Sequence, residues 1–338
     1  MRMHSPSRSW FRRCGAAALA IGLLSSTAAH AALTFNITYD SSVTNSPLAP
    51  EIEGAFQYAT GFFPQYFYNP ITINLNVGWG EIGGQSLGSF ALGQSSSNTI
   101  TTSYAQLPPS LLFNSGLVPW IDPTGGRTIT VNTADAKVLG LSGPSSGLDG
   151  SVGFDSAVTW TFDANHRAQP GAYDFIGVAE HEISEVMGRS SMLTPGCMGS
   201  SCPESVLDLF RYTAPGHHDL TGTQGDGAYF SLNGGVTSVN TYNTNNTNPA
   251  ADLADWAGQT VDAFNFGAGT GQELPVSYGD RQEMYALGYG QVFPAAPVPE
   301  PTERSLLLVG LGLIRMAWVR RASTRNREQR AMNATNQT

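Results

Sequence analysis

The chain has 338 residues, with 17 Lys and Arg against 26 Asp and Glu and a formal net charge of −9. The imbalance is larger between residues 32 and 297, where 23 acids face five Arg and one Lys, a formal charge of −17. Such an acidic segment repels a phosphate backbone, which excludes nucleic acid as a partner, whereas cations, basic peptides and neutral glycans are compatible with it. The segment is long enough to bury a core as one domain or two closely packed lobes.

The first residues have the pattern of a secretory signal peptide. Basic residues precede an apolar run at residues 15–24, and Ala29-His30-Ala31 provides a small-residue cleavage site. We therefore predict a signal peptide over residues 1–31, export with processing by signal peptidase, and a mature chain that begins near Ala32.

Hydrophobic alternation predicts a strand at Thr34–Tyr39 and another at residues 71–77, with a helix between them that follows Pro50. Three further strands are expected downstream, at residues 99–103, 128–132 and 157–162. The Gly- and Ser-rich stretch at residues 141–150 is predicted to be a loop. The predicted elements therefore mix helices with strands.

The central feature of the sequence is a helix that carries His181, Glu182 and Glu185. Apolar residues surround these three, Asp174 is placed to cap the start, and Gly188 suits a left-handed turn after the end. The apolar flanks predict a buried helix, so its carboxylates need a cation or strong hydrogen-bond donors. Because positions i and i+4 share a face, His181 and Glu185 point the same way, and Glu182 lies one step round.

His181 and Glu182 begin the pattern His-Glu-x-x-His of zinc proteases, but Glu185 stands where that pattern has its second His. In those enzymes the metal activates water and polarises the scissile carbonyl, while the Glu handles the proton. We therefore predict His181 and Glu185 as metal ligands and Glu182 as the general base. The alternative is a structural helix whose acids form a solvated face or an ion-pair cluster.

The chain resembles the metzincin group of zincins. Gly188 falls at the turning glycine of the metzincin motif, and the last predicted helix, which opens on a capping box of Ser277 and Asp280, resembles the closing helix of matrixin-type proteases. The resemblance implies an α+β zincin domain over residues 32–293. It implies a mixed twisted sheet with an N-terminal helix and the active-site helix, followed by an irregular C-terminal half.

Three segments, at residues 181–189, 208–212 and 229–231, resemble a metalloprotease family whose members carry PEP-CTERM tails. The likeness extends over most of residues 32–289. It implies an exported metal-dependent endopeptidase that acts on peptide or protein substrates. It also makes Glu185 part of a variant motif.

The sequence does not identify the third metal ligand, because Ser191 stands where metzincins have their third His. Asp208 is the first expectation, since it lies in one of the shared segments, and His217 or His218 is the second, because zinc prefers nitrogen to oxygen. A site of one His and two carboxylates is harder than the usual zinc site, so we expect zinc first, with manganese, calcium or iron as alternatives. Tyr212 either donates a hydrogen bond to the developing oxyanion or is a core aromatic residue.

Arg189 and Arg211 support a different hypothesis. Cations are scarce in residues 32–297, yet each of these Arg residues lies in a shared segment. They could pair with Glu185 and Asp208 as buried bidentate bridges. The protein would then be a non-catalytic cell-surface or matrix protein with a zincin fold, whose acids form an Arg–carboxylate cluster or a structural ion site.

Two cysteines follow the motif helix closely. Cys14 is expected to leave with the signal peptide, so Cys197 and Cys202 remain outside the cytoplasm. In that compartment the default expectation is a disulfide, which here would close a small loop.

The C-terminal segment resembles the PEP-CTERM sorting signal of Gram-negative bacteria. Pro299-Glu300-Pro301 precedes a short apolar stretch at residues 305–319 and then an Arg cluster. The resemblance implies a sorting segment over residues 298–338, transient anchoring in the inner membrane and removal by an exosortase. It further implies release to the outer cell surface or extracellular matrix, where exopolysaccharide is a candidate partner.

Overall fold

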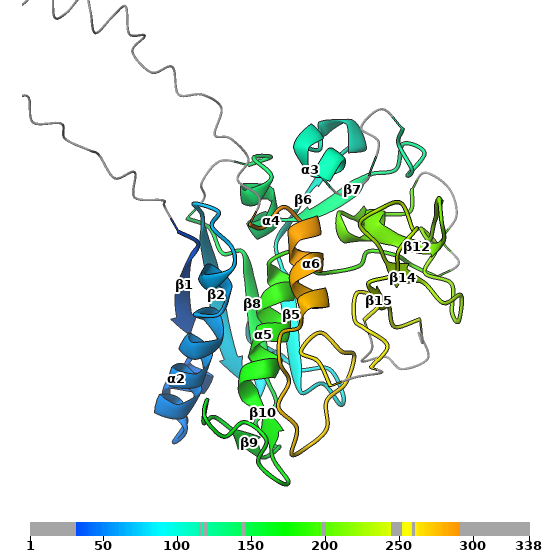
Figure 1. Cartoon of the computed structure of the whole chain (residues 1–338). Coiled ribbons are helices and arrows are strands. Elements are labelled where there is room, and N and C mark those ends of the chain that lie inside the picture. The colour runs from blue at the N-terminus through cyan, green and yellow to red at the C-terminus, as the bar shows by residue number, and fades with distance from the viewer. Residues whose placement is uncertain are drawn as a thin grey trace, which may run out of the picture. The chain divides into compact units, whose positions relative to one another are not determined.

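The computed structural model describes residues 32–114, 117, 121–142, 146–195, 197, 201–244, 252–258 and 261–290. The predicted signal peptide and the predicted sorting segment lie outside these residues. The described part is an α+β body, as expected (Figure 1). Within it, no helix has both the length and the apolar character that crossing a membrane requires.

The main sheet has four strands in the order β1-β2-β8-β5. Its strands are β1 (Thr34–Tyr39), β2 (Thr72–Trp79), β8 (Gly150–Phe154) and β5 (Gly93–Ser97). The first three run parallel, and β5 pairs antiparallel with β8 at the edge. The sheet is therefore mixed, with its one antiparallel strand at an edge.

Two helices, α2 (Ala49–Thr60) and α5 (Phe175–Val186), pack together over one face of this sheet (Figure 1). Phe154 of β8 touches both of them. Its ring centroid lies 6.1 Å from that of Phe56 in α2 and 4.6 Å from that of Phe175 in α5. Burial of these aromatic rings, each of which removes a large apolar area from water, joins the helix pair to the sheet.

The strands β5 and β8 are absent from the sequence prediction, and their composition explains why. Both are rich in Gly and Ser, which is typical of loops. Here the glycines let α5 approach the sheet closely: a Cβ on Gly150 would lie 2.7 Å from Val186 Cγ1, and one on Gly93 would lie 2.8 Å from Val178 Cγ1. The predicted strand at residues 157–162 is also shorter than expected, since only Trp160–Thr161 forms one.

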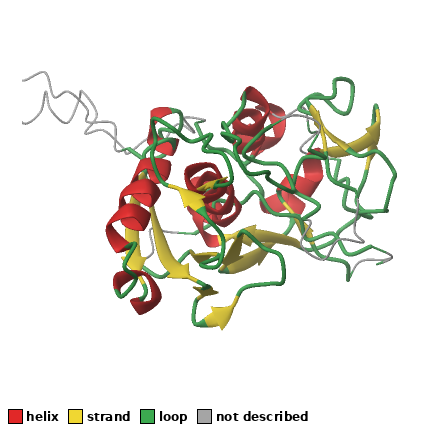
Figure 2. Ribbon diagram, turned by 90° about the horizontal axis from the view of Figure 1, so that it is seen from below, coloured by secondary structure: helices red, strands yellow, loops and turns green. Residues whose placement is uncertain are grey.

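The remaining elements are short and joined by loops, which are green in Figure 2. A three-stranded sheet contains β11 (Glu204–Ser205), β7 (Ile129–Asn132) and β6 (Thr99–Thr102). A four-stranded sheet contains β13 (His217–His218), β12 (Arg211–Ala214), β14 (Tyr229–Phe230) and β15 (Asn240–Thr241). Two-stranded pairs are β10 (Tyr173–Asp174) with β9 (Trp160–Thr161), and β3 (Glu81–Ile82) with β4 (Gln85–Ser86).

The other helices are also short. They are α1 (Ser41–Thr44), α3 (Pro109–Asn114), α4 (Thr133–Val138) and α6 (Tyr278–Ala286), with 3-10 turns at Phe63–Gln65, Tyr104–Gln106 and Leu207–Phe210. The predicted capping box of α6 is confirmed, because Ser277 Oγ accepts from Asp280 N and the Asp280 carboxylate accepts from Ser277 N at 2.8 Å. After α6, the Tyr289 hydroxyl donates to the Met187 carbonyl at 2.8 Å, which ties the closing helix to the end of α5.

Candidate functional site

Helix α5 is enclosed on nearly all sides. Every residue from Phe175 to Val186 is buried except His181, as the apolar flanks predict. Asp174 is the N-cap residue but makes no side-chain bond to the helix, contrary to expectation. Its carboxylate instead accepts from Arg167 Nε at 3.0 Å and from Leu274 N at 2.8 Å, and so anchors the helix start to neighbouring loops.

The other end of α5 is satisfied by side chains and by a turn. Gly188 adopts a positive φ of 121°, as its place after the helix predicts. The Glu185 carbonyl accepts from Gly188 N at 3.0 Å and from Asn132 Nδ2 at 2.7 Å, so this carbonyl of the last turn is paired. The helix that carries the candidate site is thus fixed at both termini.

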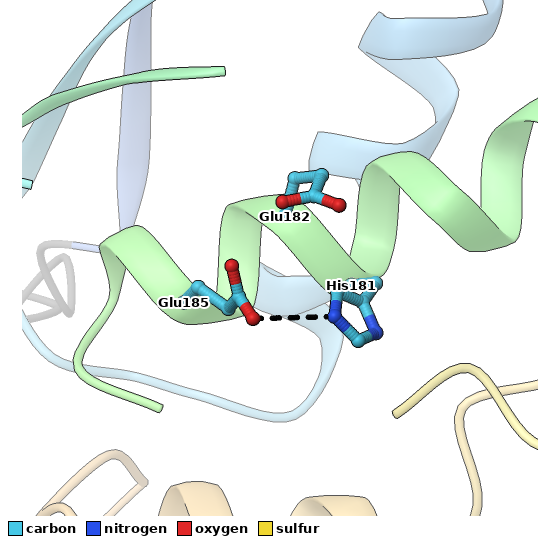
Figure 3. A group of neighbouring side chains, drawn as sticks. All are labelled: His181, Glu182 and Glu185. Atoms are coloured by element: carbon cyan, nitrogen blue, oxygen red, sulfur yellow. Dashed lines mark ion pairs between the residues drawn. The ribbon is translucent and has the colours of Figure 1, made fainter. Parts of the chain in front are cut away.

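His181, Glu182 and Glu185 form one group on α5, with one potential ligand atom from each lying within 4.8 Å of the others (Figure 3). His181 Nε2 lies 3.2 Å from Glu185 Oε1, and the two side chains are 14% and 12% exposed. His181 Nδ1 lies 2.8 Å from the Ala263 carbonyl oxygen. Because a carbonyl oxygen only accepts, Nδ1 carries a proton and donates it to Ala263, and Nε2 faces Glu185.

Glu182 lies beside the pair but is buried against β5. A Cβ on Gly93 would lie 2.7 Å from Glu182 Cγ, so the absence of that atom makes room for the side chain. Burial and, next, repulsion by Glu185 raise the pKa of the Glu182 carboxyl well above its ordinary value. A carboxyl group with a raised pKa is a stronger proton acceptor once it is ionised.

Glu185 is held as an anion by its neighbours. Burial opposes its ionisation, but His181 and Arg189 outweigh burial and lower the pKa of Glu185 to about 2. Ser95 Oγ of β5 donates to Glu185 Oε2 at 2.7 Å, which leaves Oε1 directed at His181. An ionised carboxylate with one committed oxygen therefore faces the imidazole.

A further acid, Asp255, faces the same imidazole nitrogen. Its Oδ1 atom lies 3.4 Å from His181 Nε2 and 2.8 Å from Arg189 Nη1. Nothing in the sequence indicates this contact, since Asp255 lies in an irregular segment far from α5 and belongs to no recognised motif. Only the folded chain brings it to the group.

Arg189 confirms part of the ion-pair hypothesis. It is fully buried, its Nη2 atom lies 3.4 Å from Glu185 Oε1, and its guanidinium carbon lies 4.4 Å from the centre of the Phe264 ring. Arg211, by contrast, bonds Asp219 through Nε at 2.6 Å, so the predicted Arg211–Asp208 pair is wrong. The Arg–carboxylate cluster therefore consists of Arg189, Glu185 and Asp255.

The structure does not bring Asp208 into the group around His181. Asp208 is buried, and its carboxylate accepts from Ser191 Oγ at 2.7 Å, from Met192 N at 3.0 Å and from Ser205 N at 2.7 Å. Ser191, at the position of the third metzincin His, is thus a donor to Asp208. These bonds join the chain after α5 to the turn that precedes β12.

The other candidates, Tyr212, His217 and His218, lie in the sheet formed by β12 to β15. Tyr212 is buried, and its ring centroid lies 4.3 Å from that of His218. His217 is exposed, and neither His belongs to the group around His181. The predicted disulfide is confirmed, because Cys197 and Cys202 are bonded.

No family model, curated protein or solved structure matches the chain. The donor set itself indicates which ions suit the site: one imidazole and carboxylates fit zinc, manganese or iron. Two ligand atoms that each lie about 2.1 Å from a tetrahedral metal are roughly 3.4 Å apart. The 3.2 Å distance between His181 Nε2 and Glu185 Oε1 is close to that value, so the pair fits a divalent cation.

Proposed function

We propose that the protein is an exported metal-dependent peptidase of metzincin-like zincin fold, sorted to the cell surface by its C-terminal segment. His181 and Glu185 bind the cation, and Glu182 is the general base. The observation that carries this proposal is the group itself, in which Nε2 and Oε1 lie 3.2 Å apart on one face of α5 with Glu182 adjacent.

The arrangement of elements supports the zincin fold. A mixed sheet is covered on one face by an N-terminal helix and by the helix that carries the group, and a closing helix contacts the end of the latter. The three segments that resemble PEP-CTERM metalloproteases lie on α5, on the turn that enters β12, and on β14. The irregular half between α5 and α6 also agrees with this fold.

The edge strand supports a peptide substrate. β5 is the last strand of the main sheet, and edge strands offer backbone N–H and C=O groups to an extended chain. It is also the strand against which Glu182 packs and from which Ser95 donates to Glu185. A peptide paired with this edge would therefore lie beside the catalytic group.

A bound divalent cation would supply a Lewis acid for the scissile carbonyl and lower the pKa of water. The protein's own part is to hold and move protons. Ala263 orients the His181 ring, and Ser95 orients the Glu185 carboxylate. Glu182 accepts a proton from the attacking water and delivers it to the leaving amine as the C–N bond breaks.

The test measures the metal content and proteolytic activity of the exported protein beside its Glu182→Gln and His181→Ala variants. We expect about one zinc per wild-type chain, hydrolysis of an unfolded protein such as casein, and loss of both in His181→Ala. Glu182→Gln should keep the metal and lose activity by 10²-fold or more, roughly the contribution of a general base. Full activity in Glu182→Gln would overturn the mechanism.

A second candidate is a non-catalytic surface or matrix protein. The observation in its favour is Arg189, which is fully buried and contacts both Glu185 and Asp255, so that part of their charge is already neutralised. A folded wild type that takes up no zinc, manganese, calcium or iron would favour this function.

A further inference from the structure

We propose that Asp255 is the third protein ligand of the cation site, and that Arg189 holds Asp255 and Glu185 in place from the buried side. The inference rests on the proposed function, because it concerns the same cation. It replaces Asp208, the residue that the sequence favours for this role.

The distances around one atom carry the proposal. His181 Nε2 lies 3.2 Å from Glu185 Oε1 and 3.4 Å from Asp255 Oδ1. Both values match the roughly 3.4 Å that separates ligand atoms on a tetrahedral metal. The His181 nitrogen therefore lies at ligand spacing from two carboxylate oxygens, one of them from outside α5.

Two residues of one irregular segment, Ala263 and Asp255, contact the two nitrogens of the His181 ring. The Ala263 carbonyl lies 2.8 Å from Nδ1, and Asp255 Oδ1 lies 3.4 Å from Nε2. The two parts of this segment are tied together, since Trp256 N donates to the Phe264 carbonyl at 2.9 Å. A backbone hydrogen bond thus links the part of the segment that orients the ring to the part that carries the acid, as a preorganised site requires.

The backbone around Asp255 is fixed on a second side. Its carbonyl accepts from Asn243 N at 2.6 Å, and the neighbouring Trp256 donates through Nε1 to Asp280 of α6 at 2.7 Å. Asp255 itself is buried. The position of its carboxylate is therefore set by packing and does not depend on a mobile side chain.

The charges of the carboxylates around His181 and Arg189 favour a bound divalent cation. Glu185 and Asp255 are two buried carboxylates, and among the described residues Arg189 is the Arg or Lys that forms ion pairs with them. A buried anion that lacks a matching cation is strongly unfavourable. One guanidinium faces two carboxylates here, and a cation bound at His181 Nε2 would supply further positive charge beside both of them.

Asp208 has no comparable need. Its carboxylate accepts three hydrogen bonds, from Ser191, Met192 and Ser205, which satisfy a buried carboxylate without a cation. Asp208 and Asp255 are both buried acids, so the same Asp→Asn substitution at the two positions is a matched comparison.

The test is calorimetric titration of the metal-depleted full-length exported protein with zinc, beside Asp255→Asn and Asp208→Asn. We expect Asp255→Asn to weaken zinc binding by 10²-fold or more, since changes one shell further out already cost about 10- to 100-fold. Asp208→Asn should change the affinity by no more than about threefold. Cobalt(II) absorption is a second readout, because loss of a tetrahedral ligand should weaken and shift the visible bands.

A second pair of variants covers the case in which Asp255→Asn fails to fold. Arg189→Gln and the double variant Arg189→Gln/Asp255→Asn differ only at position 255, and neither leaves a buried Arg without its partner. The double variant should bind zinc at least 10²-fold more weakly than Arg189→Gln.

The outcomes separate this inference from the proposed function. If the wild type binds zinc and Asp255→Asn binds it equally well, Asp255 is not a ligand, and the peptidase proposal stands. Loss of binding in Asp208→Asn alone would likewise overturn the inference in favour of Asp208. A folded wild type that binds no divalent metal would overturn the proposed function, and this inference with it.

Discussion

Gly93 of β5 lies directly against Glu182 of α5, so close that a Cβ on Gly93 would lie 2.7 Å from Glu182 Cγ. Contact at that distance requires the Glu182 side chain to move. In Gly93→Ala we therefore expect kcat to fall by about 10²-fold, the usual effect of displacing a catalytic group by about 1 Å. Zinc content should be unchanged, because His181 and Glu185 are not displaced.

Gly54→Ala is the control for this substitution. Gly54 lies in α2, and a Cβ there would meet no atom within 4 Å. It should leave kcat unchanged and raise the free energy of unfolding by roughly 0.5–1 kcal/mol, because Ala is the better helix former. Equal activity in the two Ala variants would show that the Gly93 contact does not position Glu182.

Metal removal should lower both activity and stability. Because only the folded chain brings Asp255 to His181 and Glu185, an ion bound by these residues would stabilise the folded state by about 2.7 kcal/mol at a concentration of 100 Kd. We expect chelation to abolish proteolysis and to lower Tm in differential scanning calorimetry, with both restored by zinc. A Tm in His181→Ala that still responds to chelator would place the stabilising ion elsewhere.

Because the pKa of Glu204 is raised, we expect the free energy of unfolding to fall as pH rises. Burial raises the pKa of Glu204 to about 7, although Arg127 Nη1 donates to its Oε1 at 2.6 Å. The folded state thus holds this proton more tightly than the unfolded state, where the pKa is near 4.5. The resulting stabilisation is complete below pH 4.5 and disappears as pH rises through 7; at about 1.4 kcal/mol per pKa unit its upper bound is about 3.5 kcal/mol, and contact with solvent lowers the actual value.

Urea denaturation at pH 5.5 and pH 8, with chelator at both, measures this slope. Glu204→Gln imitates the protonated side chain and should make the free energy of unfolding less dependent on pH. Glu51→Gln, at an exposed position of α2, is the control and should retain the wild-type slope. A Glu204→Gln slope equal to the wild-type slope would contradict the assignment.

The Cys197–Cys202 disulfide should stabilise the folded protein without affecting the site. Closing a loop of this length is worth about 2 kcal/mol through restriction of the unfolded chain. We expect the double Cys→Ser variant to lose about that much free energy of unfolding, with zinc affinity unchanged. A large loss of zinc affinity would mean that the disulfide also positions α5.

Local pattern was sufficient to predict several elements. The strand at Thr34–Tyr39, the helix after Pro50 and the capping box at Ser277 are confirmed, since each depends on residues within a few positions of one another. The shared face of His181 and Glu185 is confirmed for the same reason, because helical spacing alone determines it.

The strands beside the site could not be predicted in this way. β5 and β8 have the composition of loops, and their glycines are required by the close packing of α5, a partner that no local pattern reveals. The role of Asp208 also depends on tertiary contacts. Its place in a shared segment suggested a metal ligand, but its carboxylate accepts hydrogen bonds from Ser191, Met192 and Ser205.

By itself, the sequence determined which residues of α5 face one another, because the period of the helix converts spacing into direction. Only the tertiary structure decided what else faces them: Asp255 and Ala263 at the two nitrogens of His181, and Asp255 beside Arg189. These contacts join segments that are more than 60 residues apart in the chain. They depend on how an irregular segment packs against α5, and no periodicity in the sequence records that packing.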